Sequence, residues 1–156
     1  MLGFSNEYLV LLIGFLIAFL SFRFKKRNDE TEEETIERII GKTKYEPYTR
    51  FIICQSKHET GNFESFLSKE KFNLFGMGVP VYRESFRIDE YRAGNGEIFS
   101  VYPDYVSSVK DYISWLNYTR FPLGLETIEE FAEEIQRRNY ATDPNYEMKL
   151  INICND

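Results

Sequence analysis

Residues 47–61 read PYTRFIICQSKHETG, and this segment predicts the central helix of the domain. Pro47 suits the first turn of a helix, and the apolar run that follows predicts a helix buried on much of its circumference. Gly61 ends this helix, so Glu59 lies on its last turn. A carboxylate at that place leaves the apolar interior to face a cleft, where desolvation raises its pKa. We therefore interpret Glu59 as a candidate general acid.

The composition limits the classes of protein that this chain can represent. Its 156 residues allow one domain plus an appendage, and 14 Phe and 11 Tyr can supply a compact core. The formal net charge is −6, and the only basic cluster is one short run near the N-terminus. Phosphate backbones require clustered Lys and Arg, so we expect no nucleic-acid partner.

The two cysteines and the single histidine indicate neither a disulfide-rich scaffold nor a metal site. Cys54 and Cys154 could form one bridge, but we expect two buried free thiols. His58 is the only histidine, and the chain contains neither a CxxC nor an HExxH motif. We expect no metal site and no cofactor.

The N-terminal segment predicts a membrane anchor. Residues 8–22, YLVLLIGFLIAFLSF, are uncharged, and the span extends to residue 24 if Arg23 snorkels. No basic n-region precedes the span and no small-residue cleavage site follows it, which argues against a signal peptide. The predicted helix from Tyr8 to Phe24 would therefore stay in a lipid bilayer. The basic flank after it, residues 23–27, favours a cytoplasmic location for the rest of the chain.

We divide the chain into an anchor with its basic flank (residues 1–27), an acidic linker with a leading helix (28–44) and a main domain (45–156). The middle of the main domain predicts a hairpin, with strands at 81–91 and 97–102 around the turn AGNG at 93–96. Strand alternation places Glu90 on the same face as Phe86 and Ile88, while Asp89 is solvated.

Three helices are predicted after the hairpin. Asp104 caps the first, and Thr127 with Glu130 forms a capping box that opens the second. Asp143 is the expected N-cap of the third, with Pro144 at the first helical position. The predicted fold class is α+β: a mostly helical domain of two lobes around a groove, with one small β-hairpin.

Five motifs, in order, resemble those of glycoside hydrolase family 73, the peptidoglycan-cleaving glucosaminidases with a lysozyme-like fold. They are QSKHETG (55–61), NLFG (73–76), EY (90–91), FSVY (99–102) and YATDPNY (140–146). The resemblance covers residues 45–153. The family usually continues the glutamate motif as E-S-G-W-G, whereas this chain has Thr60 in place of Ser, and Asn62 and Phe63 in place of Trp and the second Gly.

The resemblance implies hydrolysis of the β-1,4 bond between N-acetylglucosamine and N-acetylmuramic acid, with the peptidoglycan glycan strand as partner. Glu59 would be the acid and Glu90 the second carboxylate, or an orienter if the substrate's acetamido group is the nucleophile. Glu90 could instead form a surface ion pair with a nearby arginine. Tyr140 would hold the acetamido group or the acid, or it could be an interface tyrosine with a hydrogen-bonded tip.

Five further residues are expected to bind substrate: Asn73, Phe75, Gly76, Tyr91 and Tyr146. Phe75 could equally belong to the core, and Gly76 is expected to supply backbone freedom. His58 is expected behind the acid or at the surface.

Two other functions fit the same residues: a glycan-binding or structural virion module that does not cleave, and a lytic transglycosylase. The implied location of a single-pass wall hydrolase is the cell-wall side of a membrane or a phage virion membrane, as in a phage lysis system. The basic flank argues for the opposite orientation.

Overall fold

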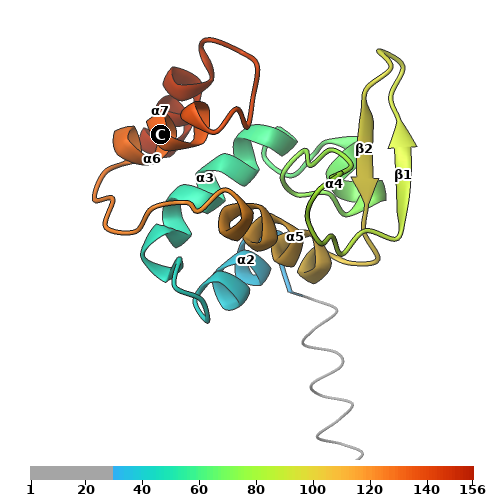
Figure 1. The fold of residues 1–156 in the computed structure, drawn as a ribbon, viewed down its shortest axis with the longest axis horizontal. Helices are drawn as coiled ribbons and strands as arrows, with labels where there is room; N and C mark the ends of the chain where they lie inside the picture. The colour runs from blue at the N-terminus through green and yellow to red at the C-terminus, as the bar shows by residue number, and fades with distance from the viewer. Residues whose placement is uncertain (1–29) are drawn as a thin grey trace, which may run out of the picture. The chain divides into compact units, whose positions relative to one another are not determined.

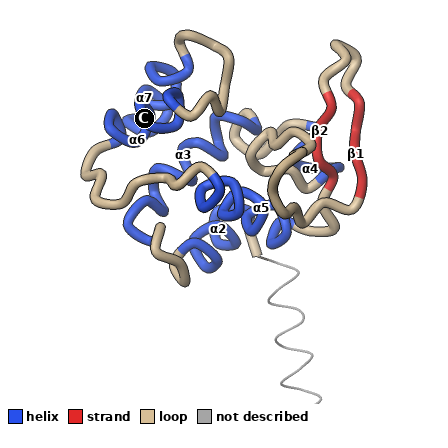
Figure 2. The backbone as a smooth tube through the Cα atoms, in the orientation of Figure 1, coloured by secondary structure: helices blue, strands red, loops and turns tan. Residues whose placement is uncertain are grey.

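The computed structural model describes residues 30–156, and its compact unit spans Glu32–Asp156. This unit is mostly helical with one two-stranded antiparallel hairpin, as predicted (Figures 1 and 2). The elements in chain order are α2 (Glu32–Ile40), the 3-10 turn η1 (Glu46–Tyr48), α3 (Thr49–Thr60), α4 (Phe66–Lys71), β1 (Asp89–Arg92), β2 (Ile98–Val101), α5 (Tyr105–Tyr118), α6 (Ile128–Arg137) and α7 (Tyr146–Asn155).

Helix α3 is the central element of this unit. It packs against α2 and α7, while α2 also packs against α5 and α6 packs against α7 (Figure 1). The leading helix α2 contributes Ile36 and Ile40, both fully buried, to the same core as the later helices. Aromatic rings fill much of that core, with Tyr48 lying edge-on or tilted against Phe121 and Phe131. The many Phe and Tyr side chains therefore build the interior around α3.

The helix caps predicted from the sequence are largely confirmed. Asp104 accepts a hydrogen bond from the N–H of Ser107 at the start of α5. Thr127 and Glu130 form a complete capping box at the start of α6. Helix α3 ends at Thr60, followed by Gly61 in the left-handed conformation. The short helix α4, which begins after the Ser65 cap, was not anticipated.

The start of α7 differs from the prediction. The helix begins at Tyr146, not at Pro144, and the side chain of Asp143 does not cap it. Instead the Asp143 carboxylate accepts from the N–H of Asn145 at 2.9 Å and from Lys149 at 2.5 Å. The side chain closes a turn ahead of the helix, so the helix begins two residues later than expected.

The first strand is much shorter than predicted. It covers Asp89–Arg92, because residues 83–86 are bound to α5 instead of running beside β2. Arg83 forms a two-pronged ion pair with the buried Asp111, at 3.0 and 2.7 Å, and the Phe86 N–H donates to the same carboxylate at 3.0 Å. Ile88, which was expected on the same strand face as Glu90, is 67% exposed, and Glu90 is exposed too.

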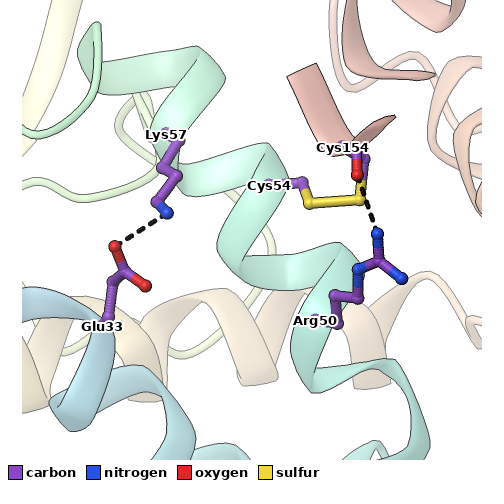
Figure 3. The surroundings of a disulfide bond; sticks show 5 residues. All are labelled: Glu33, Arg50, Cys54, Lys57 and Cys154. Carbon is purple, nitrogen blue, oxygen red and sulfur yellow. Dashed lines mark hydrogen bonds and ion pairs between the residues drawn. A yellow bond between two sulfur atoms is a disulfide. The ribbon is translucent and has the colours of Figure 1, made fainter. Parts of the chain in front are cut away.

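The two cysteines are joined, which corrects the expectation of free thiols. Cys54 of α3 and Cys154 of α7 form a disulfide with a Cα–Cα distance of 5.2 Å (Figure 3). Beside it the Arg50 guanidinium donates to the carbonyl of Cys154 at 2.9 Å. On α3, Lys57 forms an ion pair with Glu33 of α2 at 2.8 Å. Helix α3 is thus tied covalently to α7 and electrostatically to α2.

Within residues 30–156, no helix has both the length and the apolarity that crossing a bilayer requires. The predicted anchor at residues 8–24 lies outside the described residues.

Candidate active site

The turn that follows Glu59 contains three consecutive left-handed residues, Gly61, Asn62 and Phe63, with φ values of 56°, 60° and 66°. Left-handed backbone is costly for a bulky residue such as Phe63, and such strain concentrates at functional sites. The hydroxyl of Thr60 stabilises the turn: it donates to the Ser56 carbonyl at 2.6 Å and accepts from the Phe63 N–H at 2.8 Å. The turn ends α3 abruptly and leaves Glu59 at its edge.

The carboxyl of Glu59 is partly buried, and this burial raises its pKa from 4.5 to about 7. One contact acts in the opposite direction. The hydroxyl of Tyr146 donates to Oε1 of Glu59 at 2.5 Å, which favours the ionised form. Burial therefore keeps the acid protonated to a higher pH than an ordinary glutamate, as a general acid working near neutral pH requires.

Gly76 lies against the second oxygen of this carboxyl. Its φ is +59°, a conformation that glycine adopts at little cost. A Cβ at this position would lie 2.9 Å from Oε2 of Glu59, closer than real Cβ atoms approach. Both the expected backbone freedom and a steric requirement explain a glycine here, because a side chain would displace the acid.

Asn73 is a core residue, which corrects its assignment as substrate-binding, and Phe75 lies in the core, as the sequence also allowed. Asn73 is fully buried, and its amide donates to the carbonyls of Met77 and Ser100 at 3.0 and 2.9 Å. Its Oδ1 accepts from the N–H groups of Phe75 and Met77, so its bonding capacity is filled. Phe75 is fully buried with its ring stacked on Tyr112 at 4.1 Å. The NLFG motif therefore builds the wall behind Glu59.

Tyr140 supports this wall, and its hydroxyl is bonded to the backbone of the NLFG motif rather than to the acid. Its hydroxyl donates to the carbonyl oxygen of Phe75 in a short hydrogen bond, and its ring lies edge-on to Trp115 at 4.8 Å. The hydroxyl that holds Glu59 belongs instead to Tyr146, which was expected to bind substrate. Of the two tyrosines in YATDPNY, the first therefore supports the loop that carries Gly76, and the second supports the acid.

The hairpin residues lie on β1. Glu90 is exposed, its Cα is paired with Ser100 of β2, and its N–H donates to Asp89 at 2.8 Å. Within residues 30–156, no hydrogen bond or ion pair joins Glu90 to Glu59. Of the three nearby arginines that could have paired with Glu90, which are Arg83, Arg87 and Arg92, the first is bound to Asp111. Tyr91 is partly buried against Phe66 of α4 at 5.3 Å between ring centroids. Its packing fixes β1 on α4.

Two buried residues behind the acid were not identified as part of the site from the sequence. Gln55 and Tyr112, both fully buried, connect to Tyr146 behind the acid. Gln55 stands four residues before Glu59, and this helical spacing is the one signal that could have indicated it. His58 packs edge-on against the ring of Tyr146 at 5.1 Å, and burial lowers its pKa. In residues 30–156, no group of three or more His, Cys, Asp or Glu residues could hold a metal ion.

Comparison with known proteins gives the family. The model for glucosaminidase, described as mannosyl-glycoprotein endo-beta-N-acetylglucosaminidase, matches residues 38–156 and so most of the chain. The chain belongs to the glucosaminidase family. This is a family of glycoside hydrolases, and its model begins within α2, whose apolar face is part of the core.

Two curated relatives and one solved structure agree with this membership. The chain is 33% identical over 121 residues to the peptidoglycan hydrolase FlgJ of Pseudomonas aeruginosa, covering 67% of this chain and 30% of that protein. It is 30% identical over 124 residues to an autolysin of Enterococcus faecalis, covering 68% of this chain and 17% of that protein. The chain thus spans less than a third of the length of either relative.

The solved structure is the peptidoglycan hydrolase from Sphingomonas sp. A1, which matches with a TM-score of 0.58 at 24% identity. The match covers 80% of this chain and 82% of that one, and it establishes the shared fold. Among glucosaminidases this chain departs from the usual sequence after the acid, and the structure shows how. Thr60 keeps the hydroxyl of the usual Ser, whereas Phe63 adopts a left-handed φ of 66° at the usual second glycine.

Proposed function

We propose that this glucosaminidase domain hydrolyses the β-1,4 bond between N-acetylglucosamine and N-acetylmuramic acid in peptidoglycan, with Glu59 as the general acid. One observation carries the proposal: the half-buried carboxyl at the end of α3, whose pKa is raised to about 7 and whose Oε1 is held by Tyr146. The names of the relatives, a peptidoglycan hydrolase and an autolysin, support the choice of substrate.

In this mechanism the neutral Glu59 gives its proton to the glycosidic oxygen as the bond from that oxygen to the anomeric carbon breaks. Positive charge develops on the sugar ring, and the leaving sugar departs as an alcohol. Glu59 is then a carboxylate, and the hydrogen bond from Tyr146 stabilises this ionised form. In both routes water supplies the new hydroxyl of the anomeric carbon. It attacks that carbon directly, or it opens the ring that the substrate's acetamido oxygen has closed there, and the proton that it releases restores the neutral acid.

We assign Glu90 as the second carboxylate, which activates the water, because it lies in the hairpin motif that resembles the family's. Its exposure on β1 leaves the carboxylate accessible to a bound glycan. In the substrate-assisted variant of the mechanism, Glu90 orients the acetamido group instead. Asp89, its exposed neighbour on the same strand with a side chain on the other face, provides a matched control.

The disulfide bears on where the domain works. Disulfides persist in oxidising compartments and are rare in the cytosol, so the Cys54–Cys154 bridge favours the cell-wall side of a membrane. The basic flank after the apolar stretch at residues 8–24 favours the opposite side. We propose a single-pass anchor with the domain on the wall side of the membrane. The chain could then be a phage virion or lysis protein, because in that setting the basic flank would not determine the orientation.

Digestion of purified peptidoglycan by the chain and by Glu59→Gln, Glu90→Gln and Asp89→Asn tests the function. We expect fragments with reducing N-acetylglucosamine ends from the parent chain and from Asp89→Asn. Loss of a general acid lowers rates by about 10²- to 10⁴-fold, so Glu59→Gln should release almost nothing. Anhydro-muramic ends would identify a transglycosylase instead. Binding of peptidoglycan without release of fragments would leave a glycan-binding or structural module.

If Glu90→Gln loses activity and Asp89→Asn does not, Glu90 has the assigned role. Equal activity of Glu90→Gln and the parent chain would remove Glu90 from the mechanism.

A further inference from the structure

A line of three hydrogen bonds runs through the interior behind Glu59. The Tyr112 hydroxyl of α5 donates to Oε1 of Gln55 at 2.5 Å. Nε2 of Gln55 donates to the Tyr146 hydroxyl at 3.1 Å, and the Tyr146 hydroxyl donates to Oε1 of Glu59 at 2.5 Å. Gln55 and Tyr112 are fully buried, and Tyr146 is 3% exposed. The polar groups of these three residues are therefore shielded from solvent water.

The amide of Gln55 gives the line its direction. An amide nitrogen can only donate, so the oxygen of Tyr146 must accept from Gln55. A tyrosine hydroxyl has one proton, and with its oxygen engaged by Gln55 that proton is directed at Oε1 of Glu59. If the acid carried its own proton on Oε1, two protons would face each other between Glu59 and Tyr146. The acidic proton therefore belongs on Oε2, the oxygen beside Gly76.

We propose that Gln55 is a positioning residue, which directs the Tyr146 hydroxyl at Oε1 of Glu59 and so confines the transferable proton to Oε2. This inference deepens the proposed function and rests on Glu59 being its acid. A general acid must present its proton to the leaving oxygen, and a carboxyl with two equivalent oxygens would hold it on the wrong one part of the time. Gln55 removes that ambiguity without touching the substrate.

The protonation of Glu59 should report this arrangement. The titratable groups that face it are Tyr112 of α5, Tyr140 ahead of α7 and Tyr146 of α7, and burial raises the pKa of each well above its ordinary range. All three stay neutral where Glu59 titrates. His58, its neighbour on α3, packs on Tyr146, and burial, with Lys149, lowers its pKa against the opposing effect of Asp143.

The test measures the pKa of Glu59 by carbon-13 NMR of the side-chain carboxyl in the full chain and in Gln55→Met, Tyr146→Phe and the double variant. Losing the Tyr146 donor should raise the pKa of Glu59 by about one to two units, since a hydrogen bond to a charged group contributes about 1.5–3 kcal/mol. Gln55→Met should also raise it, because the freed Tyr146 oxygen can accept a proton from neutral Glu59. The double variant should match Tyr146→Phe alone.

A merely structural role for Gln55 predicts a different result. Gln55→Met would then lower stability while the pKa of Glu59 stayed at its parent value, or its effect would add to that of Tyr146→Phe. Either result overturns the proposal. If Gln55→Met does not fold, Tyr112→Phe tests the proposal instead. This variant leaves the Gln55 amide free to rotate, so it should raise the pKa of Glu59 by a smaller amount than Gln55→Met. If Tyr112→Phe does not raise that pKa, the proposal is overturned.

Activity separates this proposal from the proposed function. In variants that still cleave peptidoglycan, the alkaline limb of the pH–rate profile should move upward with the pKa of Glu59. If the chain shows the expected pKa changes but does not cleave peptidoglycan, the proposed function is rejected and the positioning role of Gln55 stands. If the chain cleaves peptidoglycan but the pKa of Glu59 is unchanged in Gln55→Met, the proposed function stands and the positioning role is rejected.

Discussion

Replacing Glu59 by glutamine should stabilise the folded chain above pH 7 and leave its stability almost unchanged below pH 4.5. The pKa of this carboxyl rises from 4.5 to about 7 on folding. Between these values the folded state binds more protons than the unfolded state, so the stability of the parent chain falls as the pH rises. Above pH 7 the folded chain holds a partly buried carboxylate, and glutamine removes that cost.

The size of the effect follows from the pKa values. A pKa that moves from 4.5 to about 7 corresponds to about 3 kcal/mol at pH 8. For a domain of this size that is roughly 10 °C in Tm. The parent chain should lose this stability gradually as the pH rises from 4.5 to about 7. Glu59→Gln should show no such loss at any pH in this interval.

Urea unfolding between pH 4 and pH 9, followed by the fluorescence of Trp115, measures this difference. The matched control is Glu70→Gln, because Glu70 is a glutamate exposed on α4. The control should follow the parent chain at every pH. If Glu59→Gln also runs parallel to the parent chain from pH 4 to pH 9, burial does not perturb the acid and the reasoning about its pKa is refuted.

Three further results are expected. Gly76→Ala and Gly61→Ala should each lose about 1–2 kcal/mol of stability, because both glycines have φ near +60°. Only Gly76→Ala should also lose activity, since a Cβ there meets Oε2 of Glu59 at 2.9 Å, whereas no atom of residues 30–156 lies within 4 Å of a Cβ at Gly61. Equal activities of the two variants would contradict this. Reducing the disulfide should lower the free energy of unfolding by roughly 4–5 kcal/mol on the chain-entropy model, because the bridge closes a loop with a sequence separation of 100. Urea unfolding with and without reductant measures this loss. Asp111→Ala should lower the free energy of unfolding by about 3–5 kcal/mol, because it leaves Arg83 as an unpaired buried charge. The double variant Arg83→Met/Asp111→Leu should lose less stability than the sum of the single changes.

The candidate site could be located from the sequence, but the roles of its residues could not all be assigned. The motif around Glu59 and the glycine after it are local, so they placed the acid at the end of α3. Asn73 was misassigned, and Phe75 could not be placed in the core rather than at the substrate, because a motif letter carries no information about exposure. Asn73 is occupied by backbone groups of Met77 and Ser100, and only the folded chain brings Ser100 beside it. The same limit concealed that Tyr146, and not Tyr140, donates a hydrogen bond to Glu59.

Features that arise between near neighbours in the chain could be predicted from the sequence. Short-range geometry decides the Thr127–Glu130 capping box, the Asp104 cap and the end of α3 at Gly61, because each involves groups a few residues apart. Contacts between distant segments became visible in the folded chain alone. Gln55 meets Tyr146 across 91 positions, and Cys54 meets Cys154 across 100. Such pairs depend on how α3, α5 and α7 pack together, and no local pattern encodes that packing.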